Sequence, residues 1–565
     1  MKMTGARAVL ECLKREGVDV AFGYPGGAIL PLYEEMYKDN FRHILTGHEQ
    51  GAVHAADGYA RVTDRPGVCI ATSGPGVCNM VTGIATANMD SIPMVIISGQ
   101  VPTGLIGRDS FQEADISGIT SPITKHNYLV KNAASIPRVL KEAFYIASTG
   151  RPGPVLIDIA KDALEAEISF QYPDKVHLPG YVVETTGQAY DIDRAVAMIQ
   201  HSQKPVFLVG GGVILSETTK YLEDSVNTTK IPVVTTLMGK GAIPDSHELH
   251  LGMGGMHGSY ASNKAISGCD LLIALGARFD ERLTSRADTF APNAQIIHFE
   301  IDDVEIDKII DIDLGIKGDL RWSLPIFAKK LKEGAFDYGA AFADWRHEVL
   351  AMKKSHPFAT PPRPGCISPQ SIFAAVRDIT RDDDTVAITD VGQHQMWAAQ
   401  FFTTDEPKHF ISSGGLGTMG FGLPAALGAK VACPEKTVVV FSGDGSILMN
   451  CQEFATLSEY GIDVKVIVLH NDTLGMIVQL QDFFYNHHYS QCTLNKRKNL
   501  PMLAESLGVK GYAIEKQDDL IPVLKEAFAH KGPALVDIRI SPEERVYPTV
   551  PGGKALSDMI LGGDA

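Results

Sequence analysis

Residues 437–446 read TVVVFSGDGS, and this stretch decides the fold that the chain is expected to take. Its continuous run of apolar and β-branched residues is typical of a strand buried inside a parallel sheet. The glycines around Asp444 form a turn, and a helix is expected from Ser446 to about Tyr460. A second apolar strand follows at 464–469. The pattern predicts a right-handed βαβ unit, whose two parallel strands end at the same edge of the sheet.

Asp444 and Asn471 directly follow these two strands and lie 27 residues apart. At a shared sheet edge, a carboxylate and an amide oxygen can bind one hard cation together with phosphate oxygens. Gly443 and Gly445 let the backbone approach an anion, and the following helix start offers free N–H groups. Gly-Asp-Gly alone is more often only a tight turn. The combination of strand, turn, helix, strand and Asn471 favours a metal–diphosphate site.

Length, charge and cysteine content limit the class of protein. The chain of 565 residues is long enough for about three or four domains. Its net charge of −16 argues against a nucleic-acid partner, because phosphate backbones bind basic surfaces. Eight scattered cysteines without a Cys-x-x-Cys pair indicate reduced thiols in a cytoplasmic protein. Residues 1–14 read as an amphipathic helix and not as a signal peptide, and no apolar run reaches the ~18 residues of a membrane span.

An internal duplication organises the chain. Residues 136–144 read IPRVLKEAF and are followed by the strand GPVLIDI, while residues 521–528 read IPVLKEAF and are followed by GPALVDI. Upstream of each copy lies a helical stretch and then a buried-type strand, at 92–98 and at 464–469. Two related α/β domains are therefore predicted, at 1–168 and 366–545, with a C-terminal tail at 546–565.

The middle of the chain predicts a third domain, at 189–350. Apolar strands alternate with helical stretches there, which indicates a parallel sheet with ligands at its carboxyl edge. Proline-containing linkers flank this domain, at about 169–188 and 355–369; their prolines are Pro173, Pro179, Pro357, Pro361, Pro362 and Pro364. The predicted fold is α/β, with three domains that each contain a mainly parallel sheet flanked by helices.

Glu49 is a candidate for proton transfer. It stands between a short strand at 43–46 and an alanine-rich helix, where a carboxylate can become half-buried. Burial raises the pKa of a carboxyl group and suits it to proton transfer. A carboxylate that only stabilises the helix start explains these residues equally well.

Several motifs together resemble a known family. They read YPGG at 24–27, TSGPG at 72–76, FQE at 111–113, DVGQHQMW at 390–397 and GGLGTMG at 414–420. In combination they resemble the catalytic subunit of acetohydroxyacid synthase (acetolactate synthase), a thiamine diphosphate-dependent family. The resemblance runs over essentially the whole chain, to Met559 and Ile560 in the tail. It is more specific than any one of the motifs, and it identifies the first and third domains as related thiamine diphosphate-binding folds.

The resemblance implies a reaction and roles for particular residues. Such enzymes decarboxylate pyruvate on thiamine diphosphate and ligate the hydroxyethyl group to a second 2-ketoacid, in branched-chain amino acid biosynthesis. Glu49 matches the residue that hydrogen-bonds the aminopyrimidine, and Met419 the residue that bends the cofactor. The implied magnesium ligands are Asp444, Asn471 and the backbone oxygen of Thr473. The implied substrate-site residues are Gly27, Phe111, Gln112 and Lys125. The remaining implied cofactor contacts are Tyr24, Pro25, Gly26, Val391, Gly392, Gln393, His394, Gly417, Gly443, Gly445, Ser446 and Met476.

The central domain resembles the form of the family that binds FAD. The run GARFDER at 276–282 is closely similar to an arginine–phenylalanine–aspartate run of that form, with Glu281 in place of a second aspartate. Arg278 would then pair with the flavin diphosphate. Further implied FAD contacts are Gly210, Gly211, His257 and Asp319. FAD performs no net redox chemistry in this family.

Two departures from the family pattern concern the substrate. Arg108 precedes Asp109, where the family usually has a small residue. Leu480 occupies a position usually held by tryptophan, which favours 2-ketobutyrate as the second substrate. Leu480 therefore predicts only a weak preference for 2-ketobutyrate over pyruvate.

Alternative functions and the partners are also implied by the resemblance. The alternatives are a pyruvate oxidase, a glyoxylate carboligase, a catabolic FAD-independent acetolactate synthase and a cofactor-binding protein without catalysis. Glu49 argues against the carboligase, whose family has an aliphatic residue there. The family further implies a homodimer or tetramer in which Glu49 and Asp444 of one site come from two chains, with a small regulatory subunit as a further partner.

Overall fold

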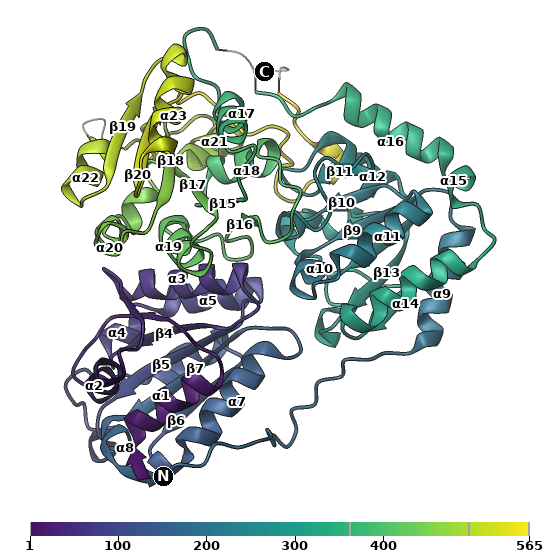
Figure 1. Cartoon of the computed structure of the whole chain (residues 1–565). Coiled ribbons are helices and arrows are strands. Elements are labelled where there is room, and N and C mark those ends of the chain that lie inside the picture. Colours follow the sequence, from purple (N-terminus) through teal and green to yellow (C-terminus); the bar gives the residue numbers. More distant parts are fainter. Residues whose placement is uncertain (1, 361–362, 495–497, 563–565) are drawn as a thin grey trace.

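The computed structural model describes residues 2–360, 363–494 and 498–562. These residues form three α/β regions, each built on a six-stranded parallel sheet with helices on its faces (Figure 1). The predicted fold class is confirmed. Pro361 and Pro362 of the second linker and residues 563–565 of the tail lie outside the described residues.

The first sheet has the strand order β3-β2-β4-β5-β7-β6, and all its neighbouring strands are parallel. Two helices from opposite ends of this domain's sequence pack against each other, α1 (Gly5–Arg15) and α7 (Ile136–Ser148). Its strands are β2 (Ala21–Gly23), β3 (His43–Leu45), β4 (Gly67–Ala71), β5 (Met94–Gln100), β6 (His126–Val130) and β7 (Pro154–Ala160).

The third sheet repeats this order, with β16-β15-β17-β18-β20-β19, again all parallel. The duplicated sequence segments occupy equivalent places, since α7 and β7 correspond to α23 (Leu520–Ala529) and β20. The structure thus confirms two related domains. The strands are β15 (Thr385–Thr389), β16 (Phe410–Ile411), β17 (Thr437–Gly443), β18 (Val464–His470), β19 (Lys510–Ile514) and β20 (Ala534–Arg539).

The central sheet has the order β11-β10-β9-β12-β13-β14 and is also parallel. Its strands are β9 (Pro205–Val209), β10 (Val233–Thr235), β11 (His250–Met253), β12 (Leu271–Leu275), β13 (Gln295–Glu300) and β14 (Leu314–Lys317). Residues 170–188 reach it from the first domain without a helix or strand, as the proline-containing linker predicted (Figure 1).

The N-terminal segment differs from the predicted helix. Residues 2–4 form a short strand, β1, which pairs antiparallel with β8 (Glu167–Ser169) at the end of the first domain. The helix α1 begins only at Gly5, because the side chain of Thr4 caps it by accepting the N–H of Arg7 at 3.2 Å. This short pairing therefore ties the start of the first domain to its end.

The predicted helix over 446–460 is divided in two. A 3₁₀ turn at Ile447–Met449 is followed by the helix α20 (Glu453–Glu459). Between them the buried side chain of Asn450 donates a hydrogen bond to the carbonyl oxygen of Gly420 at 2.7 Å. This long-range contact interrupts the helix, and the helix prediction was wrong at this point.

Helix α3 (Glu49–Val62) of the first domain packs directly on α19 (Gly422–Ala432) of the third (Figure 1). Two glycines make this contact close. A Cβ atom at Gly58 would lie 2.0 Å from the carbonyl oxygen of Ala425, and one at Gly428 would lie 1.7 Å from that of Ala55. The two backbones thus touch without intervening side chains, and apolar residues of both domains share one buried cluster.

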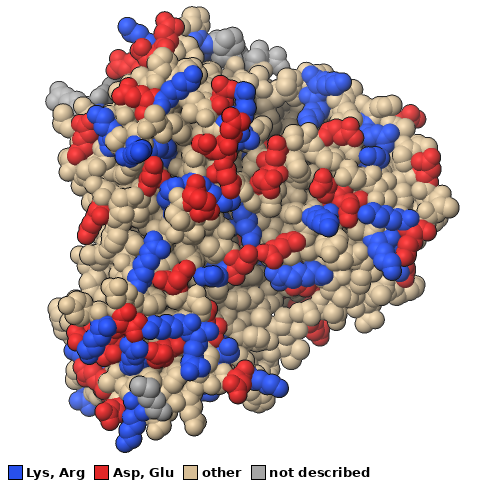
Figure 2. Space-filling model, viewed as in Figure 1, with Lys and Arg blue, Asp and Glu red and all other residues tan. Residues whose placement is uncertain are grey.

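The surface shown in Figure 2 mixes both signs of charge. Lys and Arg side chains are interspersed with Asp and Glu across all three regions on this face. Within the described ranges, the longest apolar helices are too short or too polar to cross a bilayer.

Candidate active site

Strands β17 and β18 bring Asp444 and Asn471 to one sheet edge, as the sequence predicted. The two strands are paired in parallel up to Gly443 and Leu469, and both polar residues follow just beyond. Both side chains are buried. The amide oxygen of Asn471 accepts the backbone N–H of Thr473 at 3.1 Å, which fixes its orientation. The residues predicted to hold a metal therefore lie together on adjacent strand ends.

Two basic side chains surround Asp444, and the sequence interpretation missed both. The ammonium group of Lys498 pairs with the Asp444 carboxylate, and His470 Nε2 lies 3.4 Å from it. On the other side of the ring, His470 Nδ1 is hydrogen-bonded to Asp537 Oδ1 at 2.8 Å. Burial acts to lower the pKa of His470, but the hydrogen bond and charge of Asp537 outweigh burial and raise that pKa above its usual value.

Asp444, His470 and Asp472 form a second group that could hold a metal, since their ligand atoms lie within 4.8 Å of one another. Two of these residues already have strong partners: His470 binds Asp537, and Asp472 binds Arg539 at 2.6 Å. Magnesium prefers oxygen ligands. Asp444, with the oxygens of Asn471 and Thr473, therefore fits magnesium better than the group that includes the imidazole.

The residues predicted to contact a diphosphate surround the same edge. Gly392 has φ +150°, and a Cβ there would meet the His394 ring at 2.8 Å. A Cβ at Gly443 would lie 2.8 Å from Nδ1 of the same ring. The hydroxyl of Ser446 donates to the carbonyl oxygen of Val391 at 3.0 Å. Because Gly392 and Gly443 have no side chains, the turns after β15 and β17 can approach the His394 imidazole closely.

Two buried polar atoms at this edge have no hydrogen-bond partner among the described residues, His394 Nε2 and Thr473 Oγ1. Buried polar atoms are ordinarily paired, and these two are available to bind a polar ligand. Together with the glycine turns and the oxygen ligands, they fit a metal-bound diphosphate. Met419 lies beside this edge, with its Cε 3.9 Å from a Cβ built at Gly445. Gly417 lies nearby in the same loop, with φ +70°, and Met476 lies on the helix after β18.

Glu49 is the first residue of α3, at the corresponding edge of the first sheet. It is half-buried, and its Oε2 accepts a hydrogen bond from the Asn79 amide at 2.9 Å. A Cβ at Gly76 would lie 3.4 Å from its Oε1, so the TSGPG turn adjoins this carboxylate. The YPGG turn lies against the same turn, since a Cβ at Gly26 would meet Thr72 at 2.5 Å. The first domain thus groups the predicted residues around Glu49.

Glu453 is a buried acid that the sequence interpretation missed. Its Oε2 accepts the N–H of Gly47 at 3.1 Å and the hydroxyl of Thr456 at 2.8 Å. Burial raises its pKa to about 7. Gly47 immediately precedes the His48–Glu49 start of α3, so this carboxyl of the third domain supports the segment that carries Glu49.

Of the predicted substrate residues, Gly27 follows Gly26, which lies against the TSGPG turn, and Gln112 packs on the same turn beside Phe111. Gly27 is open to solvent, and Phe111 is 88% exposed. The backbone oxygen of Gln112 packs on Gly74, 2.5 Å from a Cβ built there. Lys125 donates to the Thr149 carbonyl at 2.7 Å, near the end of α7, and burial lowers its pKa to about 8. A substrate role for Lys125 stays a prediction.

Leu480 lies on α21 (Gly475–Phe484), which follows the metal edge. It is 40% exposed, and its apolar neighbours Ile477 and Phe484 on the same helix are exposed as well. These three side chains line one open cavity with Gln481, Tyr485, Asn486, His488 and Ser490. The helix thus presents an apolar wall to this cavity.

All residues predicted to contact FAD line one cavity between the domains: Gly210, Gly211, His257, Arg278 and Asp319. A Cβ at Gly210 would meet the Gly276 carbonyl oxygen at 2.2 Å, so the β9 and β12 turns approach each other closely. Glu300, the last residue of β13, also lines the cavity. Glycine turns with an arginine and an acid at parallel strand ends fit a dinucleotide.

The third domain closes this cavity. Asp90 accepts the N–H groups of Gly414 and Gly415 at 3.2 and 2.7 Å and pairs with Arg61 at 2.7 Å. Arg282 donates to the carbonyl oxygen of Gly414 at 3.3 Å. Sequence reasoning missed these contacts, because a buried Arg–Asp pair has no local pattern. They join the cavity to the loop that carries Gly417 and Met419.

Comparison with known proteins agrees with this arrangement. The chain matches three family models, described as thiamine pyrophosphate enzyme N-terminal TPP binding domain (residues 3–119), central domain (192–326) and C-terminal TPP binding domain (390–538). It is 47% identical to an acetolactate synthase large subunit of Mycobacterium tuberculosis, over 99% of this chain and 91% of the relative.

Two further relatives are equally extensive. A probable acetolactate synthase large subunit of Methanocaldococcus jannaschii is 46% identical over 99% of this chain and 95% of its own length. The large subunit of Haemophilus influenzae is 44% identical over 99% and 98%. With these matches along its full length and the two related sheets in place, the chain belongs to the acetolactate synthase large-subunit family of thiamine pyrophosphate enzymes.

Proposed function

We propose that the protein decarboxylates pyruvate and joins the remaining two-carbon unit to a second 2-ketoacid. The products are CO2 and either 2-acetolactate, from a second pyruvate, or 2-aceto-2-hydroxybutyrate, from 2-ketobutyrate, for branched-chain amino acid biosynthesis. One observation carries the proposal. Asp444, Asn471 and His394 Nε2, which has no hydrogen-bond partner within the described part of the chain, converge at one sheet edge in a chain that matches both TPP binding domains.

Thiamine diphosphate, when bound, supplies the nucleophile and electron sink that this carbon–carbon chemistry requires. Asp444 and Asn471, with the Thr473 backbone oxygen, would hold a magnesium ion, whose charge would offset that of the diphosphate. His394 Nε2 and the turn around Gly443 would bind the diphosphate oxygens. These contacts would orient the cofactor. Proton transfer would depend on a residue of the first domain.

Glu49 is the residue that we assign to proton transfer at the aminopyrimidine. Asn79 occupies its Oε2, so Oε1 would take the hydrogen bond to the cofactor. The contacts of Glu49 lie in the first domain and those of Asp444 in the third. The third-domain residue that supports the start of α3 is Glu453, not the metal edge. We therefore propose a homodimer in which one chain supplies Glu49 and its partner supplies Asp444.

The cavity around Arg278 is proposed to hold FAD in a structural role, because its glycines and charged residues fit a dinucleotide and the metal edge needs no flavin for carboligation. The relatives are named large subunits, which supports a small regulatory subunit as an additional partner. We further propose a cytoplasmic location.

The test is a product assay. Purified protein is incubated with pyruvate, thiamine diphosphate and magnesium, and 2-acetolactate is measured after its acid conversion to acetoin. We expect acetolactate in proportion to CO2, without reduction of bound flavin. Flavin reduction during turnover would instead identify a pyruvate oxidase, and binding without pyruvate consumption would identify a non-catalytic protein.

The shared site is tested by mixing two inactive variants, Glu49→Gln and Asp444→Asn. In a dimer with sites built from two chains, a mixed dimer contains one doubly altered site and one intact site. Activity should therefore recover when the variants are co-expressed. If each chain holds a complete site of its own, both sites of the mixed dimer stay altered and no activity returns.

A further inference from the structure

A row of buried hydrogen bonds connects the FAD-type cavity with the metal edge. From the cavity, His257 Nδ1 lies 3.3 Å from Thr549 Oγ1. Thr549 Oγ1 accepts from Gln479 Nε2 at 3.1 Å, and Gln479 Oε1 accepts from Gln393 Nε2 at 3.1 Å. Gln393 Oε1 then accepts from Asn471 Nδ2 at 3.4 Å. The row thus ends on a predicted metal ligand.

All five side chains are buried, and none is more than 8% exposed. Buried amides cost free energy unless their hydrogen bonds are made. Gln479 satisfies all four of its positions: besides the two bonds above, its Nε2 donates to the Val546 carbonyl at 3.2 Å and its Oε1 accepts the Val546 N–H at 2.8 Å. Gln479 is therefore held as a fixed link and not as a solvated helix side chain.

From Asn471 to Thr549 the bonds of the row share one direction. The Thr549 hydroxyl donates to the Val546 carbonyl oxygen at 2.6 Å, so His257 Nδ1 is the donor to Thr549 Oγ1. Asn471 Oδ1 accepts the Thr473 N–H, so its Nδ2 must donate to Gln393. Gln393 then presents its Nε2 to Gln479, which presents its own Nε2 to Thr549. Turning one amide over would place two donors or two acceptors face to face. The positions of the side chains at the two ends are therefore linked through the row.

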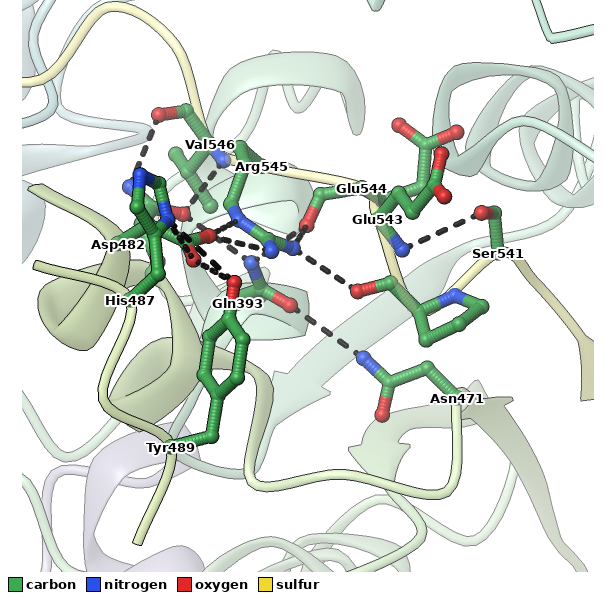
Figure 3. Close-up of polar contacts among 12 residues, drawn as sticks. Gln393, Asn471, Asp482, His487, Tyr489, Ser541, Glu543, Glu544, Arg545 and Val546 are labelled. Atoms are coloured by element: carbon green, nitrogen blue, oxygen red, sulfur yellow. Dashed lines mark hydrogen bonds and ion pairs between the residues drawn. The ribbon is translucent and has the colours of Figure 1, made fainter. Parts of the chain in front are cut away.

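The C-terminal tail supplies Thr549 to the row and is anchored on both sides. Arg545 pairs with Asp482 of α21, which also accepts from Tyr489 and His487, and Figure 3 shows these side chains gathered on the same carboxylate. The same view shows Gln393 reaching to Asn471. On the other side, the N–H of Val550 donates to the Met256 carbonyl of the central domain at 2.8 Å.

We propose that Gln479 is a positioning residue that couples the FAD-type cavity to the metal ligand Asn471. Binding at either site restrains the side chain at that end of the row and, through Gln479, the side chain at the other end, and so favours binding at the other site. This inference rests on the proposed function, since it takes FAD and magnesium–thiamine diphosphate as the ligands. Coupling between two binding sites is reciprocal by thermodynamic necessity.

The test measures binding and not turnover. Flavin-depleted protein is titrated calorimetrically with thiamine diphosphate at saturating magnesium, in the absence and presence of saturating FAD. We expect FAD to lower the Kd for thiamine diphosphate by roughly tenfold in the wild type, within the common range of coupling. Gln479→Met keeps the side-chain length but cannot form the row, and in this variant the ratio should approach one while both ligands still bind.

Gln481→Met is the matched control, because Gln481 lies on the same helix and donates to Ser490 instead of to the row. It should keep the wild-type ratio. Should Gln479→Met fail to fold by circular dichroism, Thr549→Val carries the test, since valine keeps the shape and removes only the hydroxyl that joins Gln479 to His257.

The outcomes distinguish failure of this inference from failure of the proposed function. A wild type that binds both ligands without coupling, or a Gln479→Met or Thr549→Val variant that keeps the coupling, overturns the inference and leaves the proposed function standing. A wild type that binds neither thiamine diphosphate nor FAD overturns the proposed function and this inference with it.

Discussion

Glu453 Oε2 lies 3.1 Å from the backbone nitrogen of Gly47, and this hydrogen bond crosses from the third domain to the segment that carries Glu49. Burial raises the pKa of Glu453 to about 7. A folded-state pKa above the unfolded value stabilises the fold fully at low pH, and this stabilisation is lost as pH rises through 7.

Glu453→Gln should therefore gain stability relative to the wild type as pH rises from about 5 to about 8. The rise in pKa from 4.5 to about 7 corresponds to a difference on the order of 3 kcal/mol across this range. Urea unfolding followed by circular dichroism measures it. Glu459→Gln, at an exposed position of the same helix, serves as control and should show no such trend. Parallel pH profiles for Glu453→Gln and the wild type would contradict the assignment.

Replacing Glu49 with glutamine keeps the bond to Asn79 but removes the proton acceptor. We expect a loss of roughly 10²–10⁴-fold in kcat. The affinity for magnesium–thiamine diphosphate should change little, because the metal edge lies in the other domain. Steady-state acetolactate production and calorimetric titration measure the two effects. Near-normal turnover in Glu49→Gln would rule out the assigned role.

Substitutions of two neighbouring aspartates, Asp444 and Asp472, test which residues bind the metal. Asp444→Asn should weaken magnesium-dependent binding of thiamine diphosphate by more than about tenfold, since a neutral amide replaces the charged oxygen ligand. Asp472→Asn should have a much smaller effect, because Asp472 is engaged by Arg539 and His470. Magnesium titrations of both variants give the comparison. Equal losses would favour the ligand group that contains His470 and Asp472.

Arg278 is expected to hold the flavin. The purified protein should be yellow, and Arg278→Ala should lower the affinity for FAD, because a charged partner of the diphosphate is lost. Magnesium binding, compared in flavin-depleted protein, should be unchanged. Fluorescence of released flavin provides the measurement. Arg286→Ala, which removes an exposed arginine paired with Asp288, should retain its flavin. A colourless protein that is fully active without FAD would make the FAD-independent acetolactate synthase the better interpretation.

Leu480 sets the expected substrate preference. An indole at this position would cover the extra methyl group of 2-ketobutyrate more fully than leucine, and one methylene in an apolar pocket is worth about 1–3 kcal/mol. Leu480→Trp should therefore increase the share of 2-aceto-2-hydroxybutyrate when pyruvate and 2-ketobutyrate compete. Product ratios by mass spectrometry provide the readout. A wild type that already strongly prefers 2-ketobutyrate, without a further gain in the variant, would disprove this explanation.

Much of the fold follows from sequence because parallel strands are buried on both faces. The apolar runs at β17 and β18 predicted these strands within one or two residues, and their order in the chain placed Asp444 and Asn471 at one edge. The duplicated segments predicted two related sheets in the same way. The flavin-type residues came together because each follows a strand of one parallel sheet or caps a neighbouring helix.

The parts that sequence did not predict depend on long-range contacts. Asn450 ends a helical turn because its amide binds Gly420, which lies 30 residues earlier. Residues 2–4 form a strand only because β8 is there to pair with them. Gln479 reads as an ordinary polar helix residue, and its burial arises from a tail that begins more than 60 residues later. No local pattern encodes such partners.

The contact between α3 and α19 has a consequence for change by mutation. A side chain that meets another side chain can choose a different rotamer, but a Cβ at Gly58 or Gly428 would meet main-chain atoms that have no such choice. Accommodation would require the first and third domains to separate as a whole. Two glycines that take no part in the chemistry are thus among the positions of this scaffold that are least open to evolutionary drift or to redesign.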